Sequence, residues 1–232
     1  VLADSDDDPN GYATPIPYPL VNIRAVSPNG ADDFGNLESW LRLVLTHELA
    51  HIVHLEPGRG AVGFFRKILG RAPFFFPNIF TPTWMIEGLA VYEETEGTAF
   101  GRGRNPDSLM VRRAAAREGR FPSEDQAVFG LDEWPGGQAS YLFGEGFVRH
   151  LSDSAGRDVL PRLQKVQSRQ VIPYLDDWTS SKVTGASFHS HWKEWKHLEE
   201  RDASQEATVR EDLELTLSRA LTTRGIRQTG AR

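Results

Sequence analysis

The sequence predicts an α+β fold, in which a small N-terminal sheet packs on a long apolar helix, a mostly helical half follows, and a cleft lies between them. Three observations predict this fold. Val21 to Val26 is rich in β-branched residues and ends at a Ser-Pro-Asn-Gly turn, as short strands do. Residues 36–55 carry Leu and Ile at helical spacing. Further segments with helical periodicity follow from residue 85 onward.

Composition limits the classes of function. The 232 residues are 39% hydrophobic and 25% charged, which is enough for one large domain or two subdomains around a shared cleft. The net charge of -6 argues against nucleic-acid binding, which would need a basic stripe. There is no cysteine, so any protein-bound metal must be held by His, Asp or Glu. The sequence has no run of 18 apolar residues, so we expect no transmembrane helix.

Three regions are expected along the chain: a lead-in over residues 1–20, a main domain over 21–200, and a C-terminal helix and linker over 201–232. The lead-in is acidic and proline-rich, which predicts an extended or disordered segment. Its alternating acids are also typical of a calcium loop, but Pro9 occupies the position of the glycine that such a loop needs. The chain does not begin with Met or with a signal peptide, so we expect a mature or excised segment of a longer protein.

The helix predicted over 36–55 has Asn36 as its N-cap and ends at Pro57 and Gly58. We expect it to be largely buried, because it is apolar on most sides. Its apolar flanks are Leu41, Leu43, Val44, Leu45, Leu49, Ile52 and Val53.

Residues 59–83 are unusually aromatic and contain three prolines. One interpretation is a mobile flap or a membrane-touching loop. The favoured interpretation is a connector whose aromatic rings pack over the core.

The remaining helices are predicted at Met85–Thr95, 106–118, Gln138–Ser154, 158–168 and about 187–221. The last of these begins with a stretch that contains His189, His191 and His197 beside two tryptophans. A His-x-His pair can bind metal in other contexts, but a helix separates those two side chains by about 200°. We therefore expect an amphipathic helix with its tryptophans docked on the core.

The motif His47-Glu48-Leu49-Ala50-His51 carries the clearest chemical signal. Residues four apart lie on one helix face, so both imidazoles can reach a single ion. Glu48 lies at the edge of the same face, where a carboxylate can take a proton from water at the metal. The alternative is a helix whose two histidines are satisfied by backbone or water, which is costly in a buried helix.

A third protein ligand is needed to complete such a site. Metzincins place a His six residues after the second His, but Pro57 occupies that position, and His54 replaces their glycine. We expect His54 on the helix face or behind the ligands. Glu87 is the better candidate for the third ligand, because it opens an apolar helix where a lone carboxylate is costly to bury. It can alternatively be an acid favoured by the helix dipole.

The pattern H-E-x-x-H followed by W-x-x-E-G-x-A-x-Y over Trp84–Tyr92 resembles the gluzincin metallopeptidases, in the broad peptidase-MA-like group. The resemblance covers about residues 37–156 and implies a thermolysin-like active-site cleft with Zn²⁺. It implies His47, His51 and Glu87 as metal ligands and Glu48 as general base. The G-A-M-E-N strand that captures a free amine in the aminopeptidases of this group is missing.

Tyr141 begins a segment, Tyr141-Leu142-Phe143-Gly144, which looks like the Y-x-x-G helix start of the same families. There the tyrosine hydroxyl supports the oxyanion of the tetrahedral intermediate, a task that suits a phenol donor. A core tyrosine is the alternative, and both stay open at this stage.

The C-terminal residues 221–230 look like the run-in to a TolB-like β-propeller. Bacterial proteins with that layout are exported, so the resemblance implies an exported or periplasmic setting. Zinc-dependent hydrolysis of a peptide or protein substrate is the expected function. A catalytically silent binding or scaffold module, and a metallohydrolase for a non-peptide substrate, are the alternatives.

Overall fold

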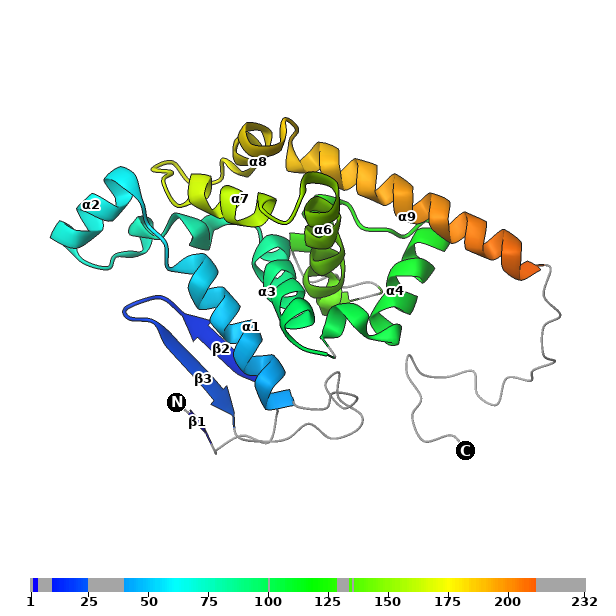
Figure 1. Cartoon of the computed structure of the whole chain (residues 1–232), viewed down its shortest axis with the longest axis horizontal. Helices are drawn as coiled ribbons and strands as arrows, with labels where there is room; N and C mark the ends of the chain where they lie inside the picture. The colour runs from blue at the N-terminus through cyan, green and yellow to red at the C-terminus, as the bar shows by residue number, and fades with distance from the viewer. Residues whose placement is uncertain are drawn as a thin grey trace.

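The computed structural model describes residues 2–3, 10–24, 40–99, 101–128, 134 and 136–211. Its elements in chain order are β1 (Leu2–Ala3), β2 (Gly11–Thr14), β3 (Leu20–Arg24), α1 (Trp40–Leu55), α2 (Gly60–Leu69), η1 (Pro73–Phe75), η2 (Pro77–Phe80), α3 (Thr83–Gly97), η3 (Arg102–Arg104), α4 (Pro106–Arg117), α5 (Glu124–Val128), η4 (Gly136–Gln138), α6 (Ala139–Ala155), α7 (Val159–Gln167), α8 (Asp176–Thr184) and α9 (Phe188–Glu211). Figure 1 shows a small sheet beside α1 and a much larger helical part beyond it.

The sheet has three strands in the order β1-β3-β2, with β1 parallel and β2 antiparallel to β3. β3 lies where the sequence predicts a strand. β2 lies inside the predicted lead-in, which therefore contributes to the sheet. Both β2 and β3 pack on α1, so the sheet covers one side of the helix that carries the histidine motif. This arrangement is compatible with the expected α+β class.

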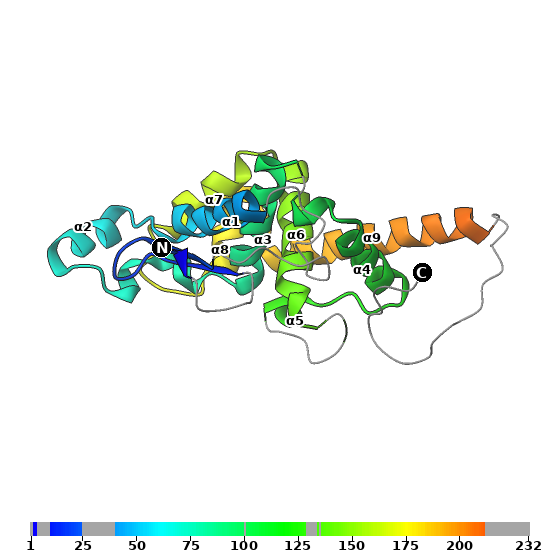
Figure 2. The ribbon, with the colours of Figure 1, turned by 90° about the horizontal axis from the view of Figure 1, so that it is seen from below.

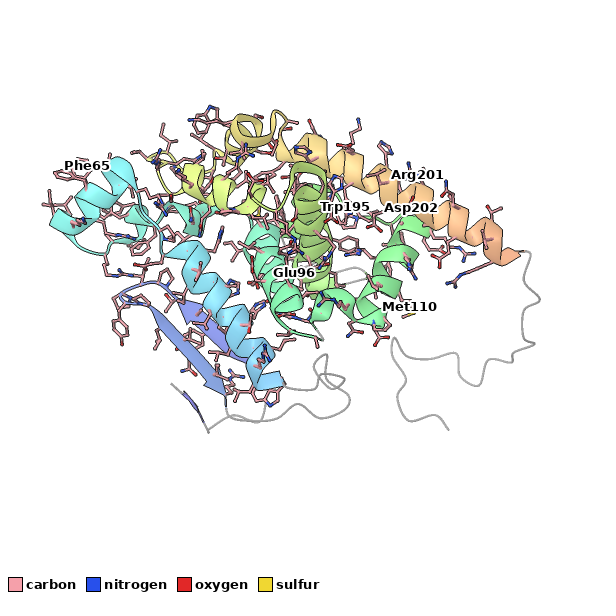
Figure 3. The ribbon with its side chains drawn as sticks, viewed as in Figure 1. Phe65, Glu96, Met110, Trp195, Arg201 and Asp202 are labelled. Carbon is pink, nitrogen blue, oxygen red and sulfur yellow. The ribbon has the colours of Figure 1, made fainter. Side chains whose placement is uncertain are left out.

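The main core lies in the helical part, around the pair α3 and α6. Trp84 from α3 and Phe143 and Phe147 from α6 are fully buried there. Trp192 and Trp195 of α9 dock against them, with ring centroids 4.8 and 5.9 Å from that of Phe147. Figure 3 labels Trp195 where α9 passes α6. The indole of Trp192 donates a hydrogen bond to the Pro122 carbonyl at 3.1 Å. The prediction of a docked amphipathic helix is confirmed.

α3 and α6 cross with their backbones in direct contact. A Cβ atom on Gly88 would overlap the backbone of Gly144, and one on Gly144 would overlap the carbonyl of Trp84. Only glycine allows so close an approach. The crossing brings Glu87, beside Gly88, and Tyr141, one turn before Gly144, to the same side of the helix pair.

The other helix predictions agree with the structure in position. The segments predicted at Met85–Thr95, 106–118, Gln138–Ser154 and 158–168 correspond to α3, α4, α6 and α7. The last predicted helix appears as α9 up to Glu211. Its predicted remainder, the Asn36 cap and the C-terminal run-in lie outside the described residues. α8 was not predicted, because its polar residues give it almost no apolar periodicity.

α1 is not largely buried, which corrects the sequence-based expectation. Leu43 and Val44 are buried, as are the motif residues, but four apolar side chains on the opposite face are exposed. Those four are Leu41, Leu45, Leu49 and Val53. The sheet and α3 cover only one side of the helix, and apolar composition alone cannot reveal which side is covered.

The aromatic segment 59–83 also differs from the favoured interpretation. Phe75 and Phe76 are buried with Val62 in a small core of their own. Phe64, Phe65 and Phe74 are exposed, however, and residues 60–69 of this connector form a helix, α2. None of the helices in the described ranges is long and apolar enough to cross a membrane.

Candidate metal centre

Two helices bring three potential ligands together. α1 presents His47 and His51 one turn apart, and α3 presents Glu87 opposite them. The two Nε2 atoms are 3.1 Å apart, and each lies 3.4 Å from Oε2 of Glu87. All three side chains are largely buried, and their ligand atoms form a group able to hold a metal ion. The structure thus brings the three predicted ligands together.

The spacing of these atoms fits a zinc ion. Zn²⁺ in a tetrahedral shell binds His nitrogen and carboxylate oxygen at about 2.0–2.1 Å, which separates neighbouring ligand atoms by about 3.3 Å. The triangle of ligand atoms in the structure has sides of 3.1, 3.4 and 3.4 Å. Carboxylate and imidazole donors without thiolate also suit a catalytic rather than a structural zinc site.

Charge around the triangle favours ionised Glu87. Burial alone raises the pKa of Glu87, but hydrogen bonding and attraction from His47 and His51 lower it to about 2. Burial likewise lowers the pKa of His47, while hydrogen bonds to Glu87 and Glu94 raise it above its ordinary value. A carboxylate that stays ionised is ready to bind a cation.

His47 is held in place from behind by Glu94, a residue to which the sequence analysis gave no role. Nδ1 of His47 lies 3.0 Å from Oε2 of Glu94, which is fully buried. In the tautomer that leaves Nε2 free for a metal ion, Nδ1 carries the proton and donates to Glu94, which orients the ring; Nη2 of Arg102 lies 2.8 Å from the same Nδ1. Glu94 lies two helical turns after Glu87, so the spacing itself was a usable signal.

Arg102 of η3 completes this buried network. Its Nε and Nη2 donate to Oε1 and Oε2 of Glu94 at 2.8 and 2.9 Å, and its backbone N–H donates to Oε1 at 3.1 Å. Burial raises the pKa of Glu94, but the charge of Arg102 and the hydrogen bond from His47 bring it to about 2. No sequence signal connected Arg102 with the motif 55 residues earlier.

Glu48 stands at the open side of the triangle. Its side chain is buried, and Oε2 has no hydrogen-bond partner among the described residues. Burial raises the pKa of Glu48, while His47 and His51 lower it by a smaller amount. A raised pKa brings a carboxylate closer to neutrality, which suits a group that must accept a proton and release it again.

The triangle opens into a hollow of about 310 Å³. Residues 10–13 of β2 and its approach form one wall, and Glu48, Arg102 and Tyr141 form others. β2 lies very close to α1 at this point. A Cβ atom added to Gly11 would lie 2.9 Å from Val44 Cγ1 and 3.0 Å from Glu48 Oε1. The segment predicted only as a lead-in therefore helps to enclose the candidate site.

Tyr141 lies at this hollow rather than in the main core. Its ring stacks near that of His47, with centroids 6.2 Å apart, and the Arg102 guanidinium lies 5.1 Å from the Tyr141 ring centroid. Burial and the charge of Glu87 raise the pKa of Tyr141 to about 12. The phenol thus keeps its proton at neutral pH and can donate it in a hydrogen bond.

His54 is separated from the triangle. Its ring is buried in a narrow, mostly apolar hollow with Met85, Leu89 and Leu160, and neither ring nitrogen has a hydrogen-bond partner among the described residues. Burial, helped by His51, lowers the pKa of His54 to about 4, so it is neutral. It does not belong to the ligand group.

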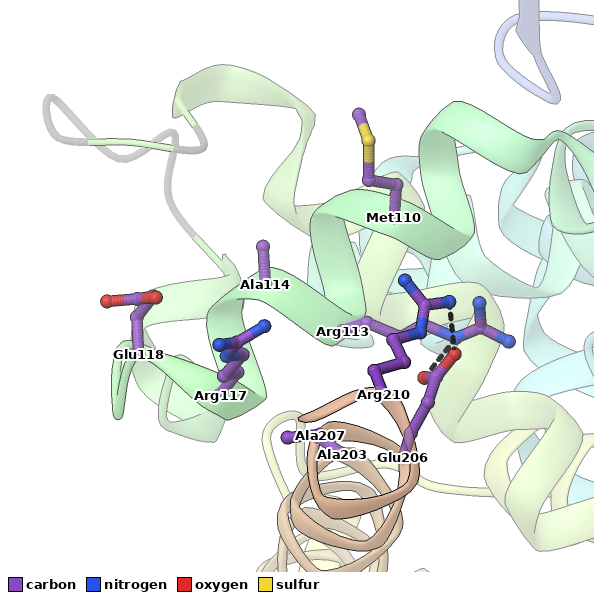
Figure 4. A pocket seen from close by; sticks show the side chains of 9 residues that line it. All are labelled: Met110, Arg113, Ala114, Arg117, Glu118, Ala203, Glu206, Ala207 and Arg210. Atoms are coloured by element: carbon purple, nitrogen blue, oxygen red, sulfur yellow. Dashed lines mark hydrogen bonds and ion pairs between the residues drawn. The ribbon is translucent and has the colours of Figure 1, made fainter. Parts of the chain in front are cut away.

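Two other places in the structure gather charged or potential ligand side chains. A hollow between α4 and the end of α9 contains several charged groups, but Arg113 and Arg210 pair there with Glu206 at 3.6 and 2.6 Å (Figure 4). A second possible ligand group consists of His150, His191 and the exposed Glu194. None of these three side chains lines the hollow beside Glu48.

Comparison with known proteins adds no relative. No family model, curated protein or solved structure matches the chain.

Proposed function

We propose that this protein is a zinc-dependent peptidase of the gluzincin kind, with a thermolysin-like arrangement of groups around its metal. The observation that carries the proposal is the triangle of His47, His51 and Glu87, whose sides match a tetrahedral zinc shell. Glu48, unpaired and facing the same hollow, supports catalysis rather than metal storage.

The chain's own residues have separate tasks in this mechanism. His47, His51 and Glu87 would hold a zinc ion, which would supply a lowered pKa for water and polarisation of the scissile carbonyl. Glu48 accepts a proton from the attacking water and passes it to the leaving amine nitrogen. Tyr141 donates a hydrogen bond to the oxyanion that develops on the carbonyl oxygen. Glu94, itself held by Arg102, keeps His47 in the ligand orientation.

Metal removal and restoration test the proposal. Purified protein is expected to contain one equivalent of zinc and to cleave members of a peptide library. Dialysis against a chelator should remove both the zinc and the cleavage, and added Zn²⁺ should restore them together. Bound zinc without cleavage of any peptide would instead support a binding module, and cleavage that survives complete zinc removal would contradict the proposal.

Tyr141→Phe is expected to lower kcat by about 10²–10³ while zinc content and folding stay unchanged. The change removes only the hydroxyl, which the proposed mechanism uses in the transition state. Steady-state kinetics with a cleaved peptide, together with metal analysis, measure the effect.

Tyr92→Phe is the matched control. Its hydroxyl is buried in the core and lies 2.9 Å from Ser152 Oγ. Its loss should cost about 1 kcal/mol of stability and leave kcat unchanged. If Tyr141→Phe behaves like Tyr92→Phe, the oxyanion role of Tyr141 is wrong.

A further inference from the structure

One end of the molecule exposes large apolar side chains from two segments, α2 with η1 and residues 171–178. Each side chain is between 48% and 74% exposed. We call this the end surface; its apolar members are Phe64, Phe65, Ile68, Leu69, Phe74, Val171, Ile172, Tyr174 and Trp178. Single exposed apolar residues are common on protein surfaces, but a group of exposed aromatic and aliphatic side chains at one end of the molecule indicates an interaction site.

The two segments are neighbours in space although they are 100 residues apart. The backbone N–H of Arg59 donates to the Ser168 carbonyl at 2.7 Å, and the rings of Phe80 and Tyr174 are 5.7 Å apart. Figures 1 and 2 both place α2 at one end of the long axis, opposite the far end of α9. Phe65 lies at that outer end in Figure 3. The two segments therefore meet at their bases and lie at the same end of the molecule.

α2 buries little of its own apolar surface. Val62 is its single buried side chain, and the helix packs chiefly on η1. Phe64, Phe65, Ile68 and Leu69 remain exposed, beside Arg66 and Lys67. A projecting helix with aromatic and aliphatic residues beside cations has the composition of helices that lie in a membrane interface.

The charge of the end surface is opposite to that of the whole protein. The chain has a net charge of -6, yet residues 57–86 contain four Lys and Arg and no Asp or Glu, and residues 159–178 contain three Lys and Arg against Asp176 and Asp177. Four exposed cations within these segments have no carboxylate partner among the described residues. They are Arg59, Lys67, Lys165 and Arg169.

We propose that the end surface docks on an anionic lipid bilayer, with the apolar side chains of α2 and residues 171–178 inserted at the headgroup level. Apolar insertion and attraction of unpaired cations to anionic headgroups reinforce each other. The lysine and arginine stems can pack along the apolar boundary while their charges reach the phosphates. Symmetric pairing of two copies through this surface is disfavoured, because it would bring one net-positive surface against another.

Vesicle flotation tests the proposal with the full chain. Protein should float with vesicles of phosphatidylcholine and phosphatidylglycerol, and much less with phosphatidylcholine alone. Binding should weaken as salt is raised. Phe65→Ser with Ile68→Ser, and separately Lys67→Glu with Arg169→Glu, should each weaken binding by about tenfold or more. Hydrolysis of a soluble peptide should not change, since none of these residues lines the metal pocket.

Matched controls lie at the other end of the molecule. Met110→Ser with Val209→Ser removes equally exposed apolar groups, and Arg117→Glu with Arg201→Glu reverses two exposed charges. Both controls should bind vesicles as the wild type does. No binding of the wild type to anionic vesicles, or equal losses in controls and end-surface variants, would overturn the proposal. Self-association that only the end-surface variants abolish, without vesicle binding, would assign the surface to a second copy instead.

Discussion

Glu48→Gln is expected to retain zinc and to lose most peptide hydrolysis. Glutamine matches the shape of glutamate but cannot accept a proton from water at neutral pH. A general base typically accelerates a reaction by about 10²–10⁴-fold, so kcat should fall by a factor of about that size. Glu48 lies beside the ligand triangle without belonging to it, so the metal affinity should change little. Metal analysis and steady-state kinetics on the same preparation separate the two properties.

Glu118→Gln provides a control for the loss of one carboxylate. Glu118 is exposed at the end of α4, away from the metal pocket, and its replacement should affect neither zinc nor rate. A Glu48→Gln variant that hydrolyses peptides at the wild-type rate would show that another group takes the proton. The proposed mechanism would then be wrong even if zinc is present.

His51→Ala is expected to abolish zinc binding and, with it, all measurable hydrolysis. His51 supplies one of only three protein ligand atoms in the triangle, and two ligands hold zinc far less tightly than three. The substitution also removes a partner that helps to keep Glu87 ionised. Elemental analysis after gel filtration in metal-free buffer measures the loss.

His191→Ala distinguishes the two ligand groups of this chain. His191 belongs to the group with His150 and Glu194, so its replacement should leave the catalytic zinc and the activity intact. Equal zinc contents in His51→Ala and the wild type would place the metal elsewhere. A loss of zinc in His191→Ala alone would point to the second group.

The triangle of candidate ligands was predictable because its strongest signal is local. Two histidines four residues apart on a helix must share a face, whatever surrounds them. Glu87 could be found because burying a carboxylate among apolar helix residues is costly unless a cation pairs with it. Glu94 was missed although it repeats the position of Glu87 two turns later. Arg102 and β2 reach the site only through tertiary packing, which leaves no local pattern.

Burial was the least predictable property of the fold. Apolar periodicity placed most helices correctly, but it does not tell which apolar face meets another element. Leu41, Leu45 and Leu49 look like core residues in sequence and are exposed on α1. The aromatic residues of α2 present the same ambiguity, since the rings that build a core also build an interaction surface.

Gly88 and Gly144 fix the distance between α3 and α6, because no residue with a side chain fits at either position. The backbones of α3 and α6 are in contact at these two glycines. A methyl group added at either position would overlap the facing backbone and push the two helices apart. That displacement would separate Glu87 from Tyr141 without altering either of them. Among descendants of this protein, Gly88 and Gly144, two positions with no functional group at all, should therefore be among the slowest to change.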